Sequence, residues 1–92
     1  MATGAISLTS EYGINSIRKI SESLIEIEFK NETISNSMLT VTSIDTCATK
    51  FTQELQSGET VVSIDISTLT PGMYAINYFV NGKSIDRQKF NK

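Results

Sequence analysis

Apolar and polar residues alternate along most of this chain, and a period of two is typical of β-strands with one buried face. The clearest run covers residues 24–29, in which Ile25, Ile27 and Phe29 are separated by two glutamates. One face of this strand is therefore predicted to be apolar and the other acidic. By the same pattern, further strands are predicted over residues 38–44, 49–55, 60–66, 73–80 and 83–90. No segment keeps the period of an amphipathic helix.

The first periodic segment is ambiguous, because Ile14, Ile17 and Ile20 follow one another at a spacing of three, which suits a helix. The segment is short, has no helix cap and lies beside strand-like sequence, so we predict a bent strand with a bulge. Counting it gives about seven strands at regular spacing, which favours an all-β fold, a single immunoglobulin-like antiparallel β-sandwich. Residues 1–13 are expected to be a loose lead-in, and residues 14–92 the sandwich domain.

The chain between residues 64 and 82 carries the strongest architectural signals. A structural corner is predicted from Leu69, Pro71, Gly72 and Tyr74, in which proline restricts φ and glycine allows the chain to reverse. In sandwiches, a tyrosine at this place commonly donates its hydroxyl to an upstream backbone group. The alternative is an ordinary strand tyrosine whose hydroxyl faces water. Asn81-Gly82 then predicts a tight hairpin between the last two strands.

The strand predicted over residues 73–80 is apolar on both faces. Its core-facing side chains are expected to be Tyr74, Ile76, Tyr78 and Val80. On the other face, Met73, Ala75 and Phe79 have only Asn77 between them as a polar residue. Neighbouring side chains can cover such a face. Alternatively, Met73 and Phe79 are candidates for recognition of a protein partner or for weak homo-oligomerisation.

Composition and charge exclude several classes of function. The 92 residues suffice for one domain, and 39% hydrophobic with 20% charged residues is typical of a globular chain. The formal net charge of −2 and the pI near 5.0 provide no electrostatic attraction to nucleic acid or to an anionic membrane. No run approaches the ~18 apolar residues of a membrane span, so no membrane insertion is expected.

Candidate chemistry is sparse. Cys47 is alone and the chain has no histidine, so neither a disulfide nor an activated thiol is predicted. Glu26 and Glu28 lie about 6.5–7 Å apart on one strand face, within reach of paired-carboxylate hydrolysis. They have no basic neighbour in sequence, however, and both are expected to be solvated. The aspartates lack the spacing of a calcium loop: Asp45, Asp65 and Asp86. We therefore expect a non-enzymatic protein without a catalytic, metal or cofactor site, and keep a small carboxylate-pair hydrolase as a weak alternative.

Basic residues gather in the last strand and the tail: Lys83, Arg87, Lys89 and Lys92. One interpretation is protection of an edge strand, because lysines discourage pairing between sheets. The other is recognition, in which a partner binds the basic side chains or adds a strand at the open edge. Lys89 and Lys92 are the candidates for recognition.

The corner, the Asn-Gly hairpin and the basic ending at residues 87–92 together resemble the C-terminal sorting domains of the Bacteroidota type IX secretion system. The resemblance covers roughly residues 24–92. It implies a small immunoglobulin-like sandwich at the end of a larger secreted protein, which the translocon recognises and which is usually removed. Gly72 and Tyr74 match the Gly-x-Tyr motif of those domains, and Lys89 and Lys92 match their basic terminus. Their Asp-x-x-Gly turn corresponds to Asp45-Thr46-Cys47-Ala48.

The chain is also similar to stand-alone secreted sandwich proteins of Bacteroidota with unknown function, whose leading segment resembles residues 16–20. Both resemblances imply a recognition or attachment module outside the cytoplasm, whether secreted, periplasmic or on the cell surface. The expected partner is a protein, either the secretion machinery or a surface protein. A cytoplasmic binding module is the remaining alternative, because the first residues lack the basic-then-apolar pattern of a signal peptide.

Overall fold

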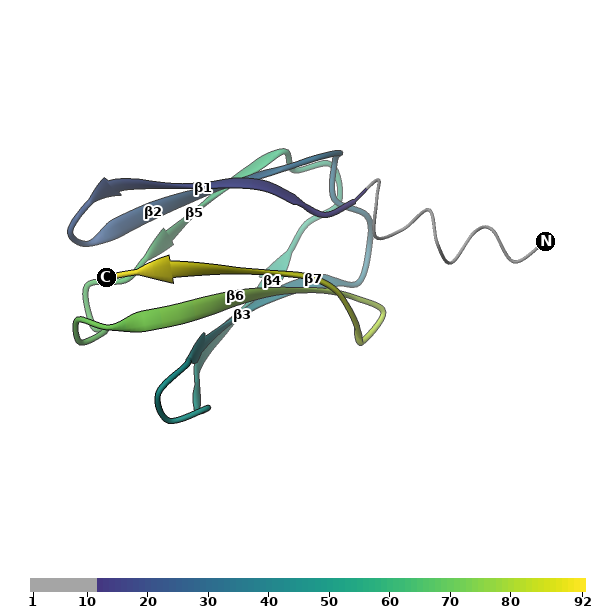
Figure 1. Cartoon of the computed structure of the whole chain (residues 1–92). Coiled ribbons are helices and arrows are strands. Elements are labelled where there is room, and N and C mark those ends of the chain that lie inside the picture. The colour runs from purple at the N-terminus through teal and green to yellow at the C-terminus, as the bar shows by residue number, and fades with distance from the viewer. Residues whose placement is uncertain (1–11) are drawn as a thin grey trace.

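The computed structural model describes residues 12–92 as two antiparallel β-sheets packed face to face (Figure 1). The strands are β1 Ile14–Ser21, β2 Leu24–Phe29, β3 Ser37–Ser43, β4 Thr49–Leu55, β5 Val61–Asp65, β6 Met73–Val80 and β7 Lys83–Asn91. One sheet has the order β1-β2-β5 and the other the order β4-β3-β6-β7. The predicted all-β sandwich of seven strands is confirmed, and the six strands that were predicted with bounds differ from the observed ones by at most one residue at either end.

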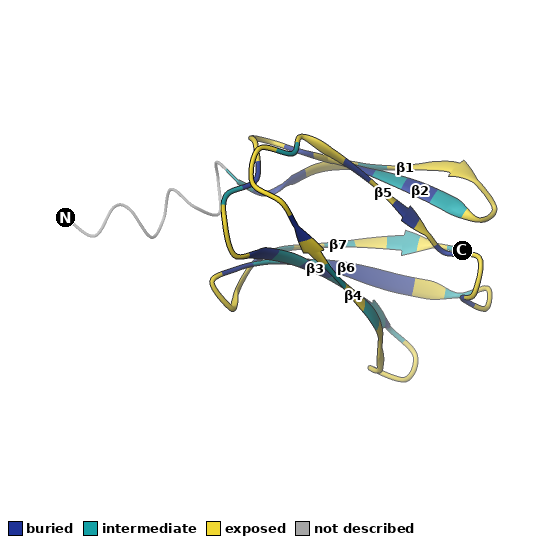
Figure 2. Ribbon diagram, turned by 180° about the vertical axis from the view of Figure 1, so that it is seen from behind, coloured by how far each residue is buried: buried dark blue, intermediate teal, exposed yellow. Residues whose placement is uncertain are grey.

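The core lies between the sheets, where the alternating apolar residues of both inner faces meet (Figure 2). In β2, Ile25, Ile27 and Phe29 are buried, and Glu26 and Glu28 point to the outer face. Strand β6 contributes four buried side chains, as predicted: Tyr74, Ile76, Tyr78 and Val80. The alternation along each strand therefore assigns its side chains to the core or to solvent.

Strand β1 is a strand, not a helix, and its pairing with β2 is irregular after Ile14 and again after Lys19. The first irregularity explains the spacing of three between Ile14 and Ile17, because it shifts the alternation of side chains by one residue. The second lies at Ile20 itself. Ile14 is buried, Ile17 is half-buried and Ile20 is exposed. The division into residues 1–13 and 14–92 stays a prediction, since most of the proposed lead-in lies outside the described residues.

One side of the sandwich is closed by contacts between the edge strands β1 and β7. The backbone N–H of Ile14 donates to Oδ2 of Asp86 at 2.7 Å, and Nε2 of Gln88 donates to the Ile14 carbonyl at 3.0 Å. Asp86 and Gln88 lie opposite Tyr78 and Ile76 of β6, which face the core. Their side chains therefore point toward the opposite sheet. Side chains therefore satisfy backbone groups that an open edge would leave to water.

The outer face of β6 is partly covered by its neighbours. Ala75 is fully buried although it faces outward, because it lies between Thr42 of β3 and Lys89 of β7. Phe79 is half-buried, and Met73 is the most exposed, at 39%. The face is therefore not a continuous apolar patch.

Tyr78 is the one described residue with a fully buried side-chain polar atom that has no hydrogen-bond partner. Its ring contacts Phe29 of the opposite sheet, with centroids 5.0 Å apart. The neighbouring Ser37 hydroxyl donates instead to the Ile34 carbonyl. Burial raises the pKa of the Tyr78 hydroxyl above its ordinary value. The ring of Tyr78 therefore stabilises the core by packing, whereas its buried, unpaired hydroxyl lowers the stability of the fold.

Two turns differ in how well their residues suit the backbone. Asn81 and Gly82 have φ of 54° and 77°, the pair of positive values that a type I′ hairpin requires. In the turn between β3 and β4, the residue with positive φ is Cys47, at 61°. The glycine of the resembling Asp-x-x-Gly turn corresponds to Ala48, which is not among the described residues with positive φ. In this chain, the turn position that favours glycine therefore lies one residue earlier than that motif predicts.

We expect Cys47→Gly to stabilise the fold by about 0.5–1 kcal/mol, because it removes the left-handed penalty of a residue with a Cβ and loses part of that gain to chain entropy. Chemical denaturation under reducing conditions measures the change. Ala48→Gly is the matched control and should give no gain. A larger gain from the Ala48 variant would contradict the assigned backbone geometry.

Candidate functional site

The corner between β5 and β6 is held by Tyr74. Its hydroxyl donates to the Thr70 carbonyl at 2.5 Å and lies 3.3 Å from the Thr70 hydroxyl. Leu69 is buried beneath the corner. Gly72 has φ of 156°, and no atom lies within 4 Å of the place that a Cβ would occupy, so the backbone conformation and not space favours glycine here. The chain thereby crosses between sheets with its polar groups paired.

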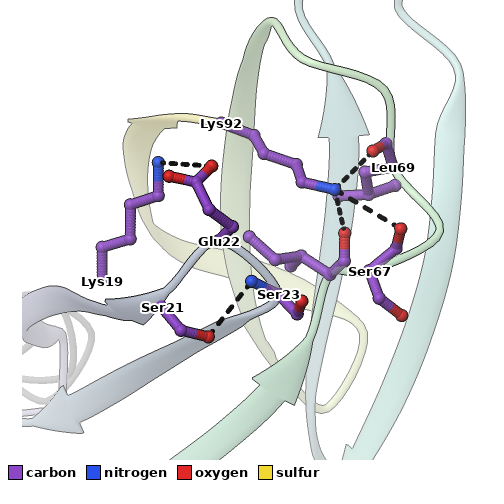
Figure 3. A network of polar contacts seen from close by, with 8 residues as sticks. Lys19, Ser21, Glu22, Ser23, Ser67, Leu69 and Lys92 are labelled. Carbon is purple, nitrogen blue, oxygen red and sulfur yellow. Dashed lines mark hydrogen bonds and ion pairs between the residues drawn. The ribbon is translucent and has the colours of Figure 1, made fainter.

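Lys92 fastens the end of β7 to the same corner (Figure 3). Its Nζ donates to the carbonyls of Leu69 at 2.6 Å, Ile66 at 2.8 Å and Ser67 at 3.4 Å. Its backbone N–H donates to the Gly72 carbonyl at 2.8 Å. One side chain therefore satisfies carbonyls of a turn in which no strand can pair with them.

Two further contacts support this junction. The rings of Tyr74 and Phe90 stack with centroids 5.7 Å apart, which joins β6 to β7 on the core side. Asp65 accepts a hydrogen bond from the Ser67 N–H at 2.9 Å. This bond, assisted by the positive charge of Lys92, lowers the pKa of the Asp65 carboxyl below its ordinary value.

The structure does not gather the four predicted recognition residues into one patch. Lys89 is exposed and lies opposite Ala75. Ala75 is the next outward-facing residue of β6 after Met73, so Lys89 and Met73 are diagonal neighbours on the outer face. Phe79 lies six residues from Met73 along β6, about 20 Å away at the rise of a strand. Lys92 instead turns its ammonium group into the corner. Met73 and Lys89 therefore form the exposed part of the candidate site, whereas the Lys92 ammonium group is hydrogen-bonded within the corner.

A polar stripe beside this site was not evident from the sequence. Asn77 of β6 donates from Nδ2 to the hydroxyls of Thr40 and Thr42 on β3, at 3.1 and 3.3 Å. The alternation of β3 predicts that both threonines face outward, but the bond to Asn77 depends on the register between the strands. The stripe separates Met73 from Phe79 with hydrogen-bonded amide and hydroxyl groups.

The glutamate pair has a basic neighbour on the adjacent strand that the sequence did not reveal. Arg18 of β1 lies across from Glu26, with its Nη2 2.5 Å from Oε1. Glu28 accepts hydrogen bonds from Asn15 at 2.9 Å and from Ser16 at 3.3 Å. The pairing of β1 with β2 brings these groups together on the outer face. The two glutamates thus connect β2 to β1 by an ion pair and hydrogen bonds on the outer face.

The remaining described surface presents little chemistry. At the opposite end from the corner, a shallow hollow of about 600 Å³ lies between the start of β3, the end of β4 and the Asn81-Gly82 turn, with Glu54 as its single titratable residue. Among residues 12–92, no group of three histidine, cysteine, aspartate or glutamate side chains is placed to hold a metal ion. In the same part of the chain, no helix is long and apolar enough to cross a membrane.

These features define a small β-sandwich domain that presents one outer sheet face beside a tethered last strand. Residues 21–91 match the family described as the secretion system C-terminal sorting domain. The match covers most of the chain, which therefore belongs to this family. A comparison with curated proteins finds no match.

Family membership implies association with a secretion machinery and a secreted or cell-surface protein. The family is not known as enzymatic. The matched span contains β2 to β7 whole, including the corner and Lys89, whereas most of β1 and Lys92 lie outside it.

Two tyrosine-to-phenylalanine changes within β6 should have opposite effects. We expect Tyr74→Phe to destabilise the fold by about 1 kcal/mol, because it removes the hydrogen bond to Thr70. Tyr78→Phe should leave stability unchanged or raise it by up to about 1 kcal/mol, because it removes a buried hydroxyl without a partner. Denaturant unfolding of the two variants provides the comparison. Equal losses in both would contradict the hydrogen-bond assignments.

Lys92→Met keeps the length of the side chain and removes its ammonium group. We expect a loss of about 1–2 kcal/mol, since the charged hydrogen bonds to partly buried carbonyls are lost and the remaining exposure moderates the effect. Thermal and denaturant unfolding measure the loss. Lys89→Met is the matched control and should change stability by less than about 0.5 kcal/mol, because Lys89 is exposed. Indistinguishable variants would show that the Lys92 contacts contribute nothing.

Proposed function

We propose that this chain is the sorting signal of a protein exported by a type IX secretion system, as found in Bacteroidota. The single observation that carries the proposal is the family match over residues 21–91. In this role the chain acts outside the cytoplasm as a folded, non-enzymatic recognition module, and a protein of the secretion machinery binds it. The tethered last strand supports recognition of the folded domain, because the corner contacts hold the end of β7 in one place.

The contact surface in this proposal is the outer face around Met73 and Lys89. Both side chains are exposed, and neither one fastens the corner. An apolar side chain beside an exposed cation is suited to a partner surface that combines an apolar contact with a carboxylate. Phe79 is a secondary candidate because it is half-buried and distant. Lys92 contributes by holding the strand in position, with its ammonium group already hydrogen-bonded.

The test is to fuse the chain behind a reporter that carries its own inner-membrane export signal, in a bacterium with a type IX system. We expect the reporter at the cell surface or in the medium, and its retention inside the cell when the chain is omitted. If the reporter stays inside although the fused domain is folded and protease-resistant, the proposed function is wrong.

Charge reversal separates recognition from stability in the same assay. Lys89→Glu should reduce export without changing the unfolding midpoint, because it alters an exposed charge. Lys30→Glu, which places the same change in the turn after β2, should export as the unaltered chain does. Lys92→Met should reduce export only as far as it destabilises the domain. Normal export of the Lys89 variant would reject this contact surface and leave the sorting role intact.

A further inference from the structure

The four edge strands of the sandwich differ in how well they are protected from pairing with another chain. Strand β1 is irregular at two points and carries Arg18 and Lys19, and β7 is connected to β1 through side chains. Strand β5 is a short run of five residues. Strand β4 has seven residues and lies at the far margin of its sheet, where it is largely exposed (Figure 2). Its pairing with β3 has one irregularity, at Lys50, and is regular from Phe51 to Leu55. Long and exposed edges are the ones that accept an added strand.

Strand β4 also has a self-complementary charge pattern. Three exposed side chains alternate along it: Lys50, Thr52 and Glu54. Thr52 and Glu54 face outward by their register with β3, and Lys50 stands exposed at the irregularity. When two such strands pair antiparallel about Thr52, Thr52 meets Thr52 of the other copy, and Lys50 meets its Glu54. The two-fold symmetry repeats this pair with the roles exchanged, which is the signature of an isologous interface. Opposite charges directly across an antiparallel pair are favourable, and threonine pairs are as well.

The two charged residues are available for such a contact. Within residues 12–92, neither Lys50 nor Glu54 takes part in a salt bridge. A lysine on an edge strand usually opposes pairing. Here Glu54 stands four residues along the same strand, so a second copy brings a partner for each lysine. The other free edge offers no equivalent, because self-pairing of β5 about Ser63 would place Asp65 opposite Val61.

We propose that this chain forms a symmetric dimer in which β4 of one copy pairs antiparallel with β4 of the other, centred on Thr52. The two four-stranded sheets then form one continuous sheet, with two Lys50–Glu54 pairs across the interface. The interface lies at the opposite margin of the sheet from β7. A dimer of this kind leaves Met73 and Lys89 accessible, so it is independent of the proposed sorting role.

The first measurement is sedimentation equilibrium of the 92-residue chain at low salt, up to about 1 mM, a concentration at which weak association is populated. We expect a monomer–dimer equilibrium that added salt weakens, because the ion pairs are exposed. Lys50→Glu and Glu54→Lys each turn both pairs into like-charge pairs and should raise the dissociation constant by about tenfold or more. Lys30→Glu and Glu32→Lys are the matched controls and should leave it unchanged.

Two combinations then test the pairing itself. The double variant K50E/E54K restores opposite charges across the two-fold axis and should recover dimerisation. Mixing the two single variants should give a heterodimer tighter than either homodimer, because one strand is then wholly acidic and the other wholly basic at these positions. Circular dichroism of each variant confirms that the sandwich is folded. A chain that stays monomeric at about 1 mM, or a dimer insensitive to all these reversals, would overturn the proposal.

Cross-linking locates the centre of the interface. Opposite residues of an antiparallel pair have Cβ atoms about 4.5–5.5 Å apart, close to the separation that a disulfide needs. Thr52→Cys in a Cys47→Ser background should therefore oxidise to a covalent dimer. Ser63→Cys in the same background, an exposed position at the centre of β5, should remain monomeric. Cross-linking through Ser63→Cys but not through Thr52→Cys would refute pairing at β4.

Discussion

The crossing of the chain from β5 to β6 is the constraint on which the rest of the sandwich depends. At this place the backbone leaves one sheet and enters the other, and several carbonyl groups lose the strand partners that satisfy them elsewhere. Tyr74 and Lys92 provide those partners from two other elements, the start of β6 and the end of the chain. The crossing, the central strand of the core and the last strand are therefore stabilised as one unit.

The two sides of the sandwich differ in their physical character. On one side, Asp86 and Gln88 of β7 hold the backbone of Ile14, and this closes the gap between the sheets. On the other side, β4 is the edge strand of its sheet, and every second residue along it is an exposed polar one: Lys50, Thr52 and Glu54. The face around Lys89 and the edge of β4 lie at opposite margins of the same sheet. One small domain thus has room for a sorting contact and a self-contact without competition between them.

The fold was largely predictable from the sequence, and the candidate site only in part. Alternation identified every strand but the first, whose isoleucines stand at a spacing of three, and the corner and hairpin residues identified the order of the last three. The exposed positions of Met73 and Lys89 followed from the same parity. The position of the Lys92 ammonium group could not be predicted, because its three acceptors lie 23 to 26 residues away in sequence. The partner of Glu26 was missed for a different reason: Arg18 is only eight residues away, but it meets Glu26 through the irregular register of β1 with β2.

By itself, the sequence determined which residues form strands and which face of each strand is buried, because a period of two is a local property of the chain. The tertiary structure decided what those faces meet. It buried the outward-facing Ala75 between Thr42 and Lys89 and left the Tyr78 hydroxyl without a hydrogen-bond partner. It also gave positive φ to Cys47 and not to Ala48. These outcomes depend on the register between strands and on the packing between sheets, and both are set by contacts between residues far apart in sequence.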